Sequence, residues 1–341
     1  MKKYARLVGT LFLLTVMMSV SMVGIATAQD AGRICFAFQD VSTEFWVASH
    51  MAIIGTLEGE GFEVVQLNGG QDANRQLEQI RDCIAQGVDG IILIAQDGES
   101  GTTIVSEAQE ADVPIATFNR PPADTSRGIV VVADNRSVAR QAVEFMAQKA
   151  LGRFEATGER INPLILVGDL ADPNAVQRRA GFMDVIEKYP DLFNTPVEIA
   201  TEWNTDIALA GLEAAITANP DIDFIFTSSD FLFPTIRSVL DSHGMWIPAG
   251  QQGHVILGGL DGDATACQLI HEGYVDSTGV QDLYFEAELV LDGILTAIEN
   301  GDSQPNAVLQ DPGFALTAGN IDFQEMDSWG CVLLSEGFLD Q

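Results

Sequence analysis

Short apolar runs alternate with longer amphipathic segments along almost the whole chain. Continuous apolar runs such as 34–38, 90–94 and 114–118 are separated by segments of helical periodicity such as 73–86 and 102–111. The apolar runs lack polar alternation, so they are expected to be strands with helices covering both faces. Strand–helix–strand units of roughly 25–30 residues give right-handed crossovers and a parallel sheet. The pattern therefore predicts an α/β fold built from doubly wound parallel sheets.

The alternation occurs as two series that meet near residues 128–134. The strands expected in the second series are 162–167, 197–200, 224–227, 255–258 and 276–280, and a long helix follows at 282–299. A chain of this length is large enough for two domains, each with its own core. We therefore predict two Rossmann-like lobes with a cleft between them. In open parallel sheets, ligands bind where the carboxyl ends of the strands meet.

The first 28 residues have the three parts of a secretory signal peptide. Residues 1–6 carry three cations, residues 7–25 are apolar and uncharged, and the sequence Ala-Thr-Ala at 26–28 fits a signal-peptidase site. A retained membrane anchor is the alternative, since an apolar run of about 19 residues approaches spanning length. The small-residue site favours cleavage, and no cysteine follows it to carry a lipid anchor. We expect a mature chain that starts near Gln29 and works outside the cytoplasm.

The charge balance is strongly acidic. The whole chain has 17 lysines and arginines against 49 acidic residues, a formal net charge of -32. Without the three cations of the expected leader, 14 basic residues face the same 49 acidic residues, and the net charge becomes -35. A charge of this sign repels nucleic acid phosphates and anionic membranes, which argues against both as partners.

The cysteines and histidines lack the spacing of a metal site, and no metal or cofactor is expected. An oxidising compartment permits disulfides, but the cysteines are widely separated and form no C-x-x-C pair. Cys35 falls in an expected strand and Cys83 on an expected helix, so buried free thiols are at least as well supported as bridges. The residues concerned are Cys35, Cys83, Cys267, Cys331, His50, His243, His254 and His271.

Catalytic motifs of α/β enzymes are missing from the sequence. It contains no G-x-S-x-G elbow, no Walker P-loop and no G-x-G-x-x-G after a strand. The glycines between residues 55 and 61 end an expected helix. Carboxylates are so abundant that any proposed catalytic pair carries little weight. A secreted enzyme is therefore the weaker alternative to a binding protein.

Aromatic and bidentate polar residues follow the expected strands. They occur in the loops 39–46, 95–97, 119–120, 169–178, 202–204, 228–230, 260–262 and 281–282. Flat aromatic faces stack on the C–H patches of a sugar ring, and Asp, Asn, Arg and Gln offer paired donors or acceptors to neighbouring hydroxyls. These loops predict recognition of a polyol. The alternative for single positions is an ordinary structural role: a helix cap for Asp134, turn chemistry for Asp261 and a plain loop position for Asp97.

With these residues in order, the chain resembles type I periplasmic solute-binding proteins of sugar ABC importers, most closely the ribose-binding subgroup, over residues 33–323. The motifs that carry the resemblance are Phe45-Trp46, the segment 86–92 (QGVDGII), Val113-Pro114-Ile115 before Asn119-Arg120, Ala133-Asp134-Asn135, Arg178 before Gly181-Phe182, Trp203, Ser229-Asp230, Asp261-Gly262 and Gln281.

The resemblance implies two lobes that close on one sugar about a three-segment hinge near Asp134, Gln281 and Pro312-Gly313. Lobe 1 would comprise residues 31–133 and 281–312, and lobe 2 residues 134–280 and 313–325. Residues 326–341 form an extension without an assigned role. It also implies a monomer in the periplasm whose partners are an ABC permease and its ATPase. A ligand sensor that docks on a membrane chemoreceptor is the alternative.

The same resemblance assigns candidate ligand contacts, and no catalytic residue. Phe45, Trp46 and Trp203 would be the stacking aromatics. The polar contacts would be Asn119, Arg120, Arg178, Ser229, Asp261 and Gln281, with Thr43, Asp97 and Asp230 as further candidates.

Four positions depart from the ribose-binding pattern. Ile94 replaces an asparagine, Thr43 and Ser229 replace amides, and Asn119 is neutral where an aspartate is usual. A buried hydroxyl without its partner costs roughly 1–3 kcal/mol, so these changes put ribose itself in doubt. A transcription regulator with the same ligand domain would need a basic helix-turn-helix before residue 35, where this chain has its expected signal peptide.

Overall fold

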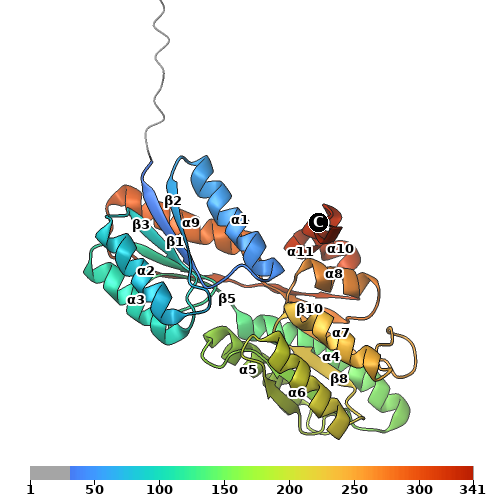
Figure 1. Cartoon of the computed structure of the whole chain (residues 1–341). Helices are drawn as coiled ribbons and strands as arrows, with labels where there is room; N and C mark the ends of the chain where they lie inside the picture. The colour runs from blue at the N-terminus through green and yellow to red at the C-terminus, as the bar shows by residue number, and fades with distance from the viewer. Residues whose placement is uncertain (1–30, 341) are drawn as a thin grey trace, which may run out of the picture.

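The computed structural model describes residues 31–340, so the signal peptide expected at 1–28 lies outside the described residues. Two six-stranded sheets lie side by side, each with helices on both faces (Figure 1). The order in the first sheet is β11-β5-β4-β3-β1-β2, and in the second β12-β10-β9-β8-β6-β7. All neighbours pair in parallel except β10 and β12, which are antiparallel. The predicted two-lobed α/β fold is confirmed.

Lobe 1 holds the first sheet. Its strands are β1 (Arg33–Phe38), β2 (Glu63–Asn68), β3 (Gly90–Leu93), β4 (Ile115–Phe118), β5 (Gly128–Ala133) and β11 (Asn306–Asp311). Its helices are α1 (Glu44–Gly59), α2 (Ala73–Ala85), α3 (Gly98–Glu110) and α9 (Leu283–Asn300).

Lobe 2 holds the second sheet. Its strands are β6 (Pro163–Val167), β7 (Val197–Ala200), β8 (Phe224–Thr227), β9 (Ile256–Asp261), β10 (Ser277–Val280) and β12 (Phe314–Thr317). Its helices are α4 (Asn135–Thr157), α5 (Pro173–Lys188), α6 (Thr205–Ala218), α7 (Phe233–Ser242), which follows the 3₁₀ turn η1 (Asp230–Leu232), and α8 (Ala264–His271). The C-terminal part adds α10 (Ile321–Gln324), η2 (Glu325–Asp327), α11 (Trp329–Ser335) and η3 (Phe338–Asp340).

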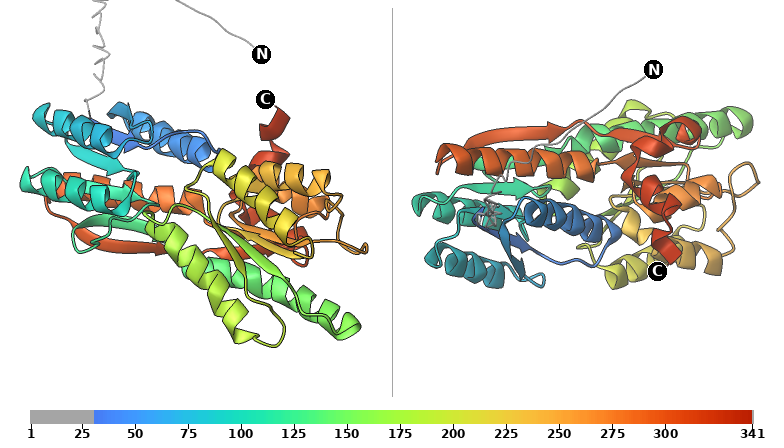
Figure 2. Two further views of the ribbon diagram at one scale, coloured as in Figure 1. Left: turned by 60° about the horizontal axis from the view of Figure 1, so that its bottom comes forward. Right: turned by 90° about the horizontal axis from the view of Figure 1, so that it is seen from above.

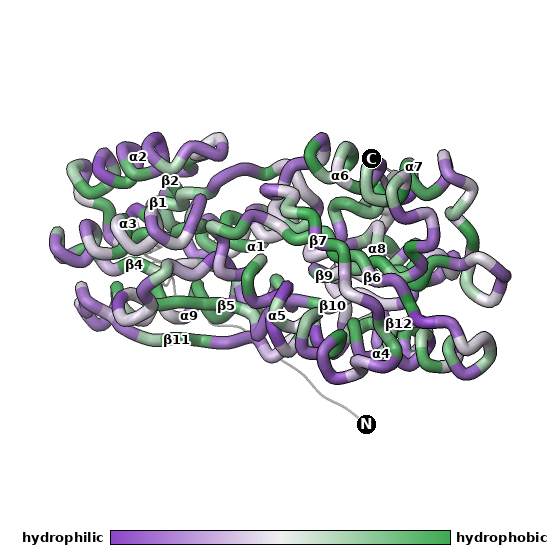
Figure 3. Tube along the Cα trace, turned by 90° about the horizontal axis from the view of Figure 1, so that it is seen from below, coloured by the Kyte–Doolittle hydropathy of each residue, from purple (hydrophilic) through white to green (hydrophobic). Residues whose placement is uncertain are grey.

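Successive residues of the strands pack on opposite faces of each sheet. In β1, Ile34 and Phe36 belong to the core cluster that includes α1 and α9, whereas Cys35 and Ala37 belong to the cluster that includes α2 and α3. Both faces are buried, which explains why the sequence of β1 is continuously apolar. The covering helices have one buried side, and the tube of α4 alternates between green and purple accordingly (Figure 3). Among residues 31–340, none of the helices has the length and apolar character needed to cross a bilayer.

The chain crosses between the two sheets at residue 134, at 281–282 and at 312–313 (Figure 2). Asp311 bonds to all three crossings. Its backbone carbonyl accepts from the amide of Asp134 at 2.8 Å, and its carboxylate accepts from the amides of Asp282 and Gly313 at 2.8 and 2.9 Å. Because these bonds meet at one residue, the three crossings are held together as one hinge.

The cysteines form two disulfides, so of the two alternatives that the sequence left open, bridges and buried free thiols, the structure has the bridges. Cys35 of β1 is bonded to Cys83 of α2, with 6.4 Å between the Cα atoms, and Cys267 of α8 is bonded to Cys331 of α11, with 5.3 Å. Partners 48 and 64 residues apart leave no spacing signal in the sequence. Only the packing of α2 under β1, and of α11 on α8, brings the cysteines together.

Candidate functional site

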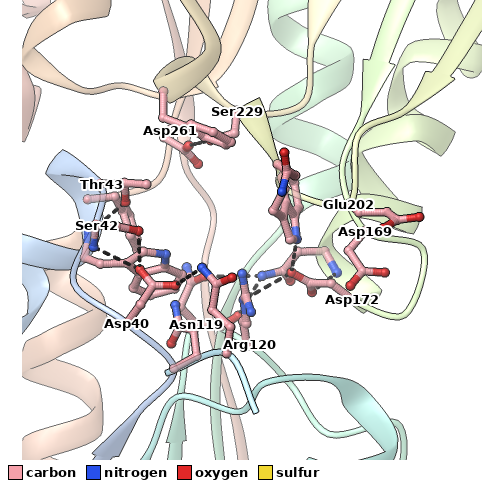
Figure 4. A pocket seen from close by; sticks show the side chains of 18 of the residues that line it. Asp40, Ser42, Thr43, Asn119, Arg120, Asp169, Asp172, Glu202, Ser229 and Asp261 are labelled. Carbon is pink, nitrogen blue, oxygen red and sulfur yellow. Dashed lines mark hydrogen bonds and ion pairs between the residues drawn. The ribbon is translucent and has the colours of Figure 1, made fainter. Parts of the chain in front are cut away.

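A cavity of about 370 Å³ lies between the lobes at the carboxyl ends of the strands. Residues of both lobes line it, and Figure 4 shows side chains from both sides turned toward one space. The position agrees with the rule that parallel sheets bind ligands at the ends where their loops converge.

Lobe 1 contributes an aromatic–guanidinium pair from the start of α1 and the end of β4. The helix begins at the cavity because the Thr43 side chain caps it, its hydroxyl accepting from the Trp46 amide at 3.3 Å. This cap turns Phe45 and Trp46 inward, with their rings edge to face at 4.9 Å. The Arg120 guanidinium lies 5.4 Å from the centre of the Trp46 ring, within the range of a cation–π contact.

Lobe 2 contributes a matching pair. The Arg178 guanidinium lies 5.8 Å from the centre of the Trp203 ring. Trp203 fits there because residue 168 is a glycine, where a Cβ atom would lie only 2.2 Å from the indole ring. Each lobe therefore presents one tryptophan and one arginine to the cavity.

A buried network fixes the polar side chains of lobe 2. Arg178 donates to the Asn135 side chain at 2.6 Å, to the Ser228 carbonyl at 2.6 Å and to the Asp261 carboxylate at 3.0 Å. Asp261 also accepts from the Ser229 hydroxyl and, at 2.7 Å, from the Gln281 amide. A buried carboxylate with these partners is held in one orientation, so its geometry exists before a ligand arrives.

Side chains from the two lobes meet beside the cavity. The Arg120 Nε atom of lobe 1 lies 3.2 Å from the Asp172 carboxylate of lobe 2, and Trp203 donates to the same oxygen at 3.1 Å. The side-chain amide of Asn174 in lobe 2 donates to the backbone carbonyl of Asn119 in lobe 1 at 3.1 Å. The structure therefore has its lobes in contact around the cavity.

Five residues that line the cavity have a positive φ, which is rare for residues with a side chain. The φ angles of Gln71, Asn119, Glu202, Trp203 and Asp261 are 61°, 60°, 54°, 53° and 138°. Such conformations cost of order 1–3 kcal/mol each and concentrate at functional sites. Their coincidence at one cavity is an independent indication that this cavity is the working site.

Two buried carboxyls near the cavity have strongly shifted pKa values. Burial and the neighbouring Asp261 charge raise the pKa of Asp230 to about 8. Burial and the charge of Asp311 raise the pKa of Glu286 to about 8, although Asn119 donates to its carboxylate at 3.0 Å. Both groups therefore favour the protonated form at neutral pH, and neither lines the cavity.

Ten of the twelve candidates from the sequence line the cavity. They are Thr43, Phe45, Trp46, Asn119, Arg120, Arg178, Trp203, Ser229, Asp261 and Gln281. Asp97 does not line it, because its carboxylate caps α3 by accepting from the Ser100 amide at 2.7 Å, and this cap starts α3 at Gly98 rather than at the expected residue 102. Asp230 lies behind Asp261 and accepts instead from the Gly262 amide at 2.7 Å and from the Thr278 hydroxyl at 2.6 Å.

Several residues of the cavity wall are not among the candidates predicted from the sequence. The main ones are Gln39, Asp40, Asp169, Asp172, Asn174, Glu202 and Asp206. Most belong to loops that the sequence placed at strand ends, but nothing in a loop shows which side chain turns inward. Gln39 is only 1% exposed, and both of its side-chain polar atoms lack a hydrogen-bond partner within the described part of the chain. A buried amide without partners is costly unless something else satisfies it, which marks Gln39 as a further candidate contact.

Comparisons with known proteins agree with this architecture. The chain is 25% identical over 296 residues to the D-xylose-binding periplasmic protein of Escherichia coli (strain K12), covering 86% of this chain and 84% of that one. It is 23% identical over 245 residues to the ribose import binding protein of Bacillus subtilis (strain 168), covering 71% and 73%. The crystal structure of the Caulobacter myo-inositol binding protein bound to myo-inositol has the same fold, with a TM-score of 0.75, 17% identity and coverage of 90% and 97%.

The family model described as a periplasmic binding protein domain matches residues 34–303. That range contains nearly all of both sheets and every loop that lines the cavity. Since the match spans well over half of the chain, the protein belongs to the periplasmic binding protein family.

Proposed function

We propose that the protein is the extracytoplasmic substrate-binding protein of an ABC importer, and that it captures one monosaccharide or small polyol in the interlobe cavity. The observation that supports this most directly is the tryptophan–arginine pair that each lobe presents beside amides and carboxylates. Indole rings stack on sugar C–H faces, and these polar groups match vicinal hydroxyls. The names of the relatives, which state D-xylose, ribose and myo-inositol binding, support the same ligand class.

The size and charge of the cavity narrow this class. Its volume of about 370 Å³ lies at the lower end of small-molecule sites, roughly 300–1,000 Å³, which suits one sugar ring. Six carboxylate residues and two arginines line it. Both arginines are already paired with carboxylates, Arg120 with Asp172 and Arg178 with Asp261. A neutral polyol is therefore favoured over a sugar acid or a sugar phosphate.

The contacts between the lobes suggest how binding is signalled. Side chains from both lobes surround the cavity, so a ligand that touches both walls favours the form in which the lobes are together. We propose that this closed form, as a periplasmic monomer released by cleavage of the signal peptide, delivers the ligand to the permease and its ATPase. The protein then works by binding and release, without turnover of the ligand.

The test is isothermal titration of the mature chain, beginning at Gln29, with D-xylose, D-ribose, xylitol and myo-inositol. We expect at least one of them to bind at one per chain with a Kd of roughly micromolar or tighter. D-xylonate, a charged analogue of D-xylose, should bind more weakly than the neutral sugars. Absence of binding to all four neutral compounds, or consumption of any of them by the protein, would contradict the proposal. Deletion of the gene should abolish uptake of the compound that binds.

A further inference from the structure

The C-terminal extension is fixed against the loop that carries Asp261. The Cys267–Cys331 disulfide joins α11 to α8, and the Trp329 indole donates to the Asp261 carbonyl at 3.0 Å. Residue 330 has to be a glycine there, because a Cβ atom would lie 2.2 Å from the Gly262 carbonyl oxygen. Trp329 is only 2% exposed. These contacts tie the extension to the backbone that positions a site carboxylate.

The same region touches lobe 1. The Trp329 ring meets the Phe45 ring edge to face, with 5.8 Å between centroids. The Glu44 carboxylate accepts from the Ala264 amide at 2.8 Å, from the Thr265 amide at 3.3 Å and from the Thr265 hydroxyl at 2.5 Å. Figure 1 shows α8, α10 and α11 grouped beside the end of α1 at which Glu44 and Phe45 lie.

Glu44 completes the cap of a helix that belongs to the other lobe. The first amides of a helix have no partner within it, and the Asp263 side chain of lobe 2 satisfies only that of Ala266, at 2.7 Å. The Glu44 carboxylate accepts from the two amides that precede Ala266, those of Ala264 and Thr265. A carboxylate is also attracted to the positive end of the helix dipole, and its hydrogen bonds are charge-assisted. Lobe 2 alone cannot supply these contacts.

We propose that the start of α8 and Trp329, crosslinked through Cys267–Cys331, form a seat on which Glu44 and Phe45 dock when the lobes close. The contacts that Glu44 and Phe45 make with this seat join the two lobes, so their free energy stabilises the closed form and not the open one. Glu44 precedes Phe45 and Trp46, which line the cavity, so docking also sets the position of those rings. The C-terminal extension thus acts as a positioning element for the site. The inference rests on the proposed ligand-binding function.

Two pairs of matched variants separate docking from general stability. Glu44→Ala removes the docking carboxylate, whereas Glu58→Ala removes an exposed carboxylate from the same helix. The double variant Cys267→Ser/Cys331→Ser removes the crosslink of the seat. Its control, Cys35→Ser/Cys83→Ser, removes the crosslink between β1 and α2, away from the seat.

Affinity is measured with D-xylose, D-ribose, xylitol and myo-inositol, together with the dissociation rate by stopped flow. For each compound that the wild type binds, Glu44→Ala and the seat double variant should raise Kd by about 5- to 50-fold, mostly through faster dissociation. The Kd of both control variants should stay within twofold of the wild-type value, although the Tm of the Cys35/Cys83 control should be lower. Seat variants with wild-type Kd, or equal Kd effects from the two disulfides, would overturn the inference.

Hydrogen exchange keeps the two proposals apart, because it reports on the seat independently of affinity. At a saturating concentration of a compound that the wild type binds, exchange of the Ala264 and Thr265 amides should be slower than in the ligand-free wild type. This slowing should be lost in Glu44→Ala and kept in Glu58→Ala, and equal slowing in the wild type and Glu44→Ala would overturn the seat even if sugars bind. If the wild type binds none of the four compounds, the proposed function fails, and the seat, which rests on it, fails with it.

Discussion

Replacement of Arg120 by alanine should weaken ligand binding strongly while leaving the free protein folded. Arg120 is 8% exposed, and its guanidinium contacts the Asp172 carboxylate at 3.2 Å and the Gln96 carbonyl at 3.1 Å. Asp172 belongs to lobe 2, so the variant loses an ion pair that exists only when the lobes meet. In the open form both groups are free to be hydrated. The cost therefore falls on closure and not on the stability of either lobe.

The magnitude follows from what remains around Asp172. Removing one member of a buried interfacial pair costs roughly 2–5 kcal/mol, largely because the other charge stays buried without its partner. Here Asp172 keeps two donors, the Trp203 indole at 3.1 Å and the backbone amide of Asn174 at 2.9 Å. The lower part of that range applies, and about 2–3 kcal/mol corresponds to a rise in Kd of roughly 30- to 160-fold.

Titration calorimetry with a compound that the wild type binds gives the affinity, and thermal unfolding of the ligand-free protein gives Tm. The matched control is Arg136→Ala, which removes an exposed arginine whose partner is Asp184 at 2.7 Å. The control should bind like the wild type, since exposed pairs contribute little. A double-mutant cycle with Asp172→Asn measures the coupling between the two groups. An Arg120→Ala variant that binds within threefold of the wild type, or strictly additive effects in the cycle, would refute the reasoning.

Two further perturbations probe the interior. Arg178→Met leaves the buried Asp261 without its counter-ion, and the other acceptors of Arg178 also lie in lobe 2. The free energy of unfolding should therefore fall by about 3–5 kcal/mol. Denaturant unfolding measures this change, and a fall of less than about 1 kcal/mol would contradict the prediction. Glu286→Gln should flatten the pH dependence of stability. The folded-state pKa of Glu286, about 8, lies above its ordinary value of 4.5, so its stabilising contribution is complete below pH 4.5 and is lost as the pH rises through 8. Urea unfolding at pH 5, 7 and 9 should show that the free energy of unfolding falls less with rising pH in the variant than in the wild type. An identical pH dependence in the two proteins would disprove the assignment.

The strands were predictable because burial on both faces leaves a direct mark on the sequence. The prediction for β8 matches the structure at both ends, Phe224 and Thr227, and all 4 residues of this strand are buried. The disulfides left no comparable mark. Cys83 is one of several residues on the face of α2 that turns toward the sheet, and only the three-dimensional packing shows that it meets Cys35.

Local sequence also does not predict which single residues of a loop reach the site. Asp97 and Asp172 give identical local signals, since each follows a strand and caps the next helix by accepting from a backbone amide. Asp97 contributes only its cap, whereas the second carboxylate oxygen of Asp172 accepts from Trp203 and pairs with Arg120 of the other lobe. The difference lies in which loop of the opposite lobe each one faces, and that depends on how the lobes are oriented about the three crossings near Asp311. Local sequence therefore identifies the loops of such a cleft, whereas the arrangement of the lobes decides which of their residues the ligand can reach.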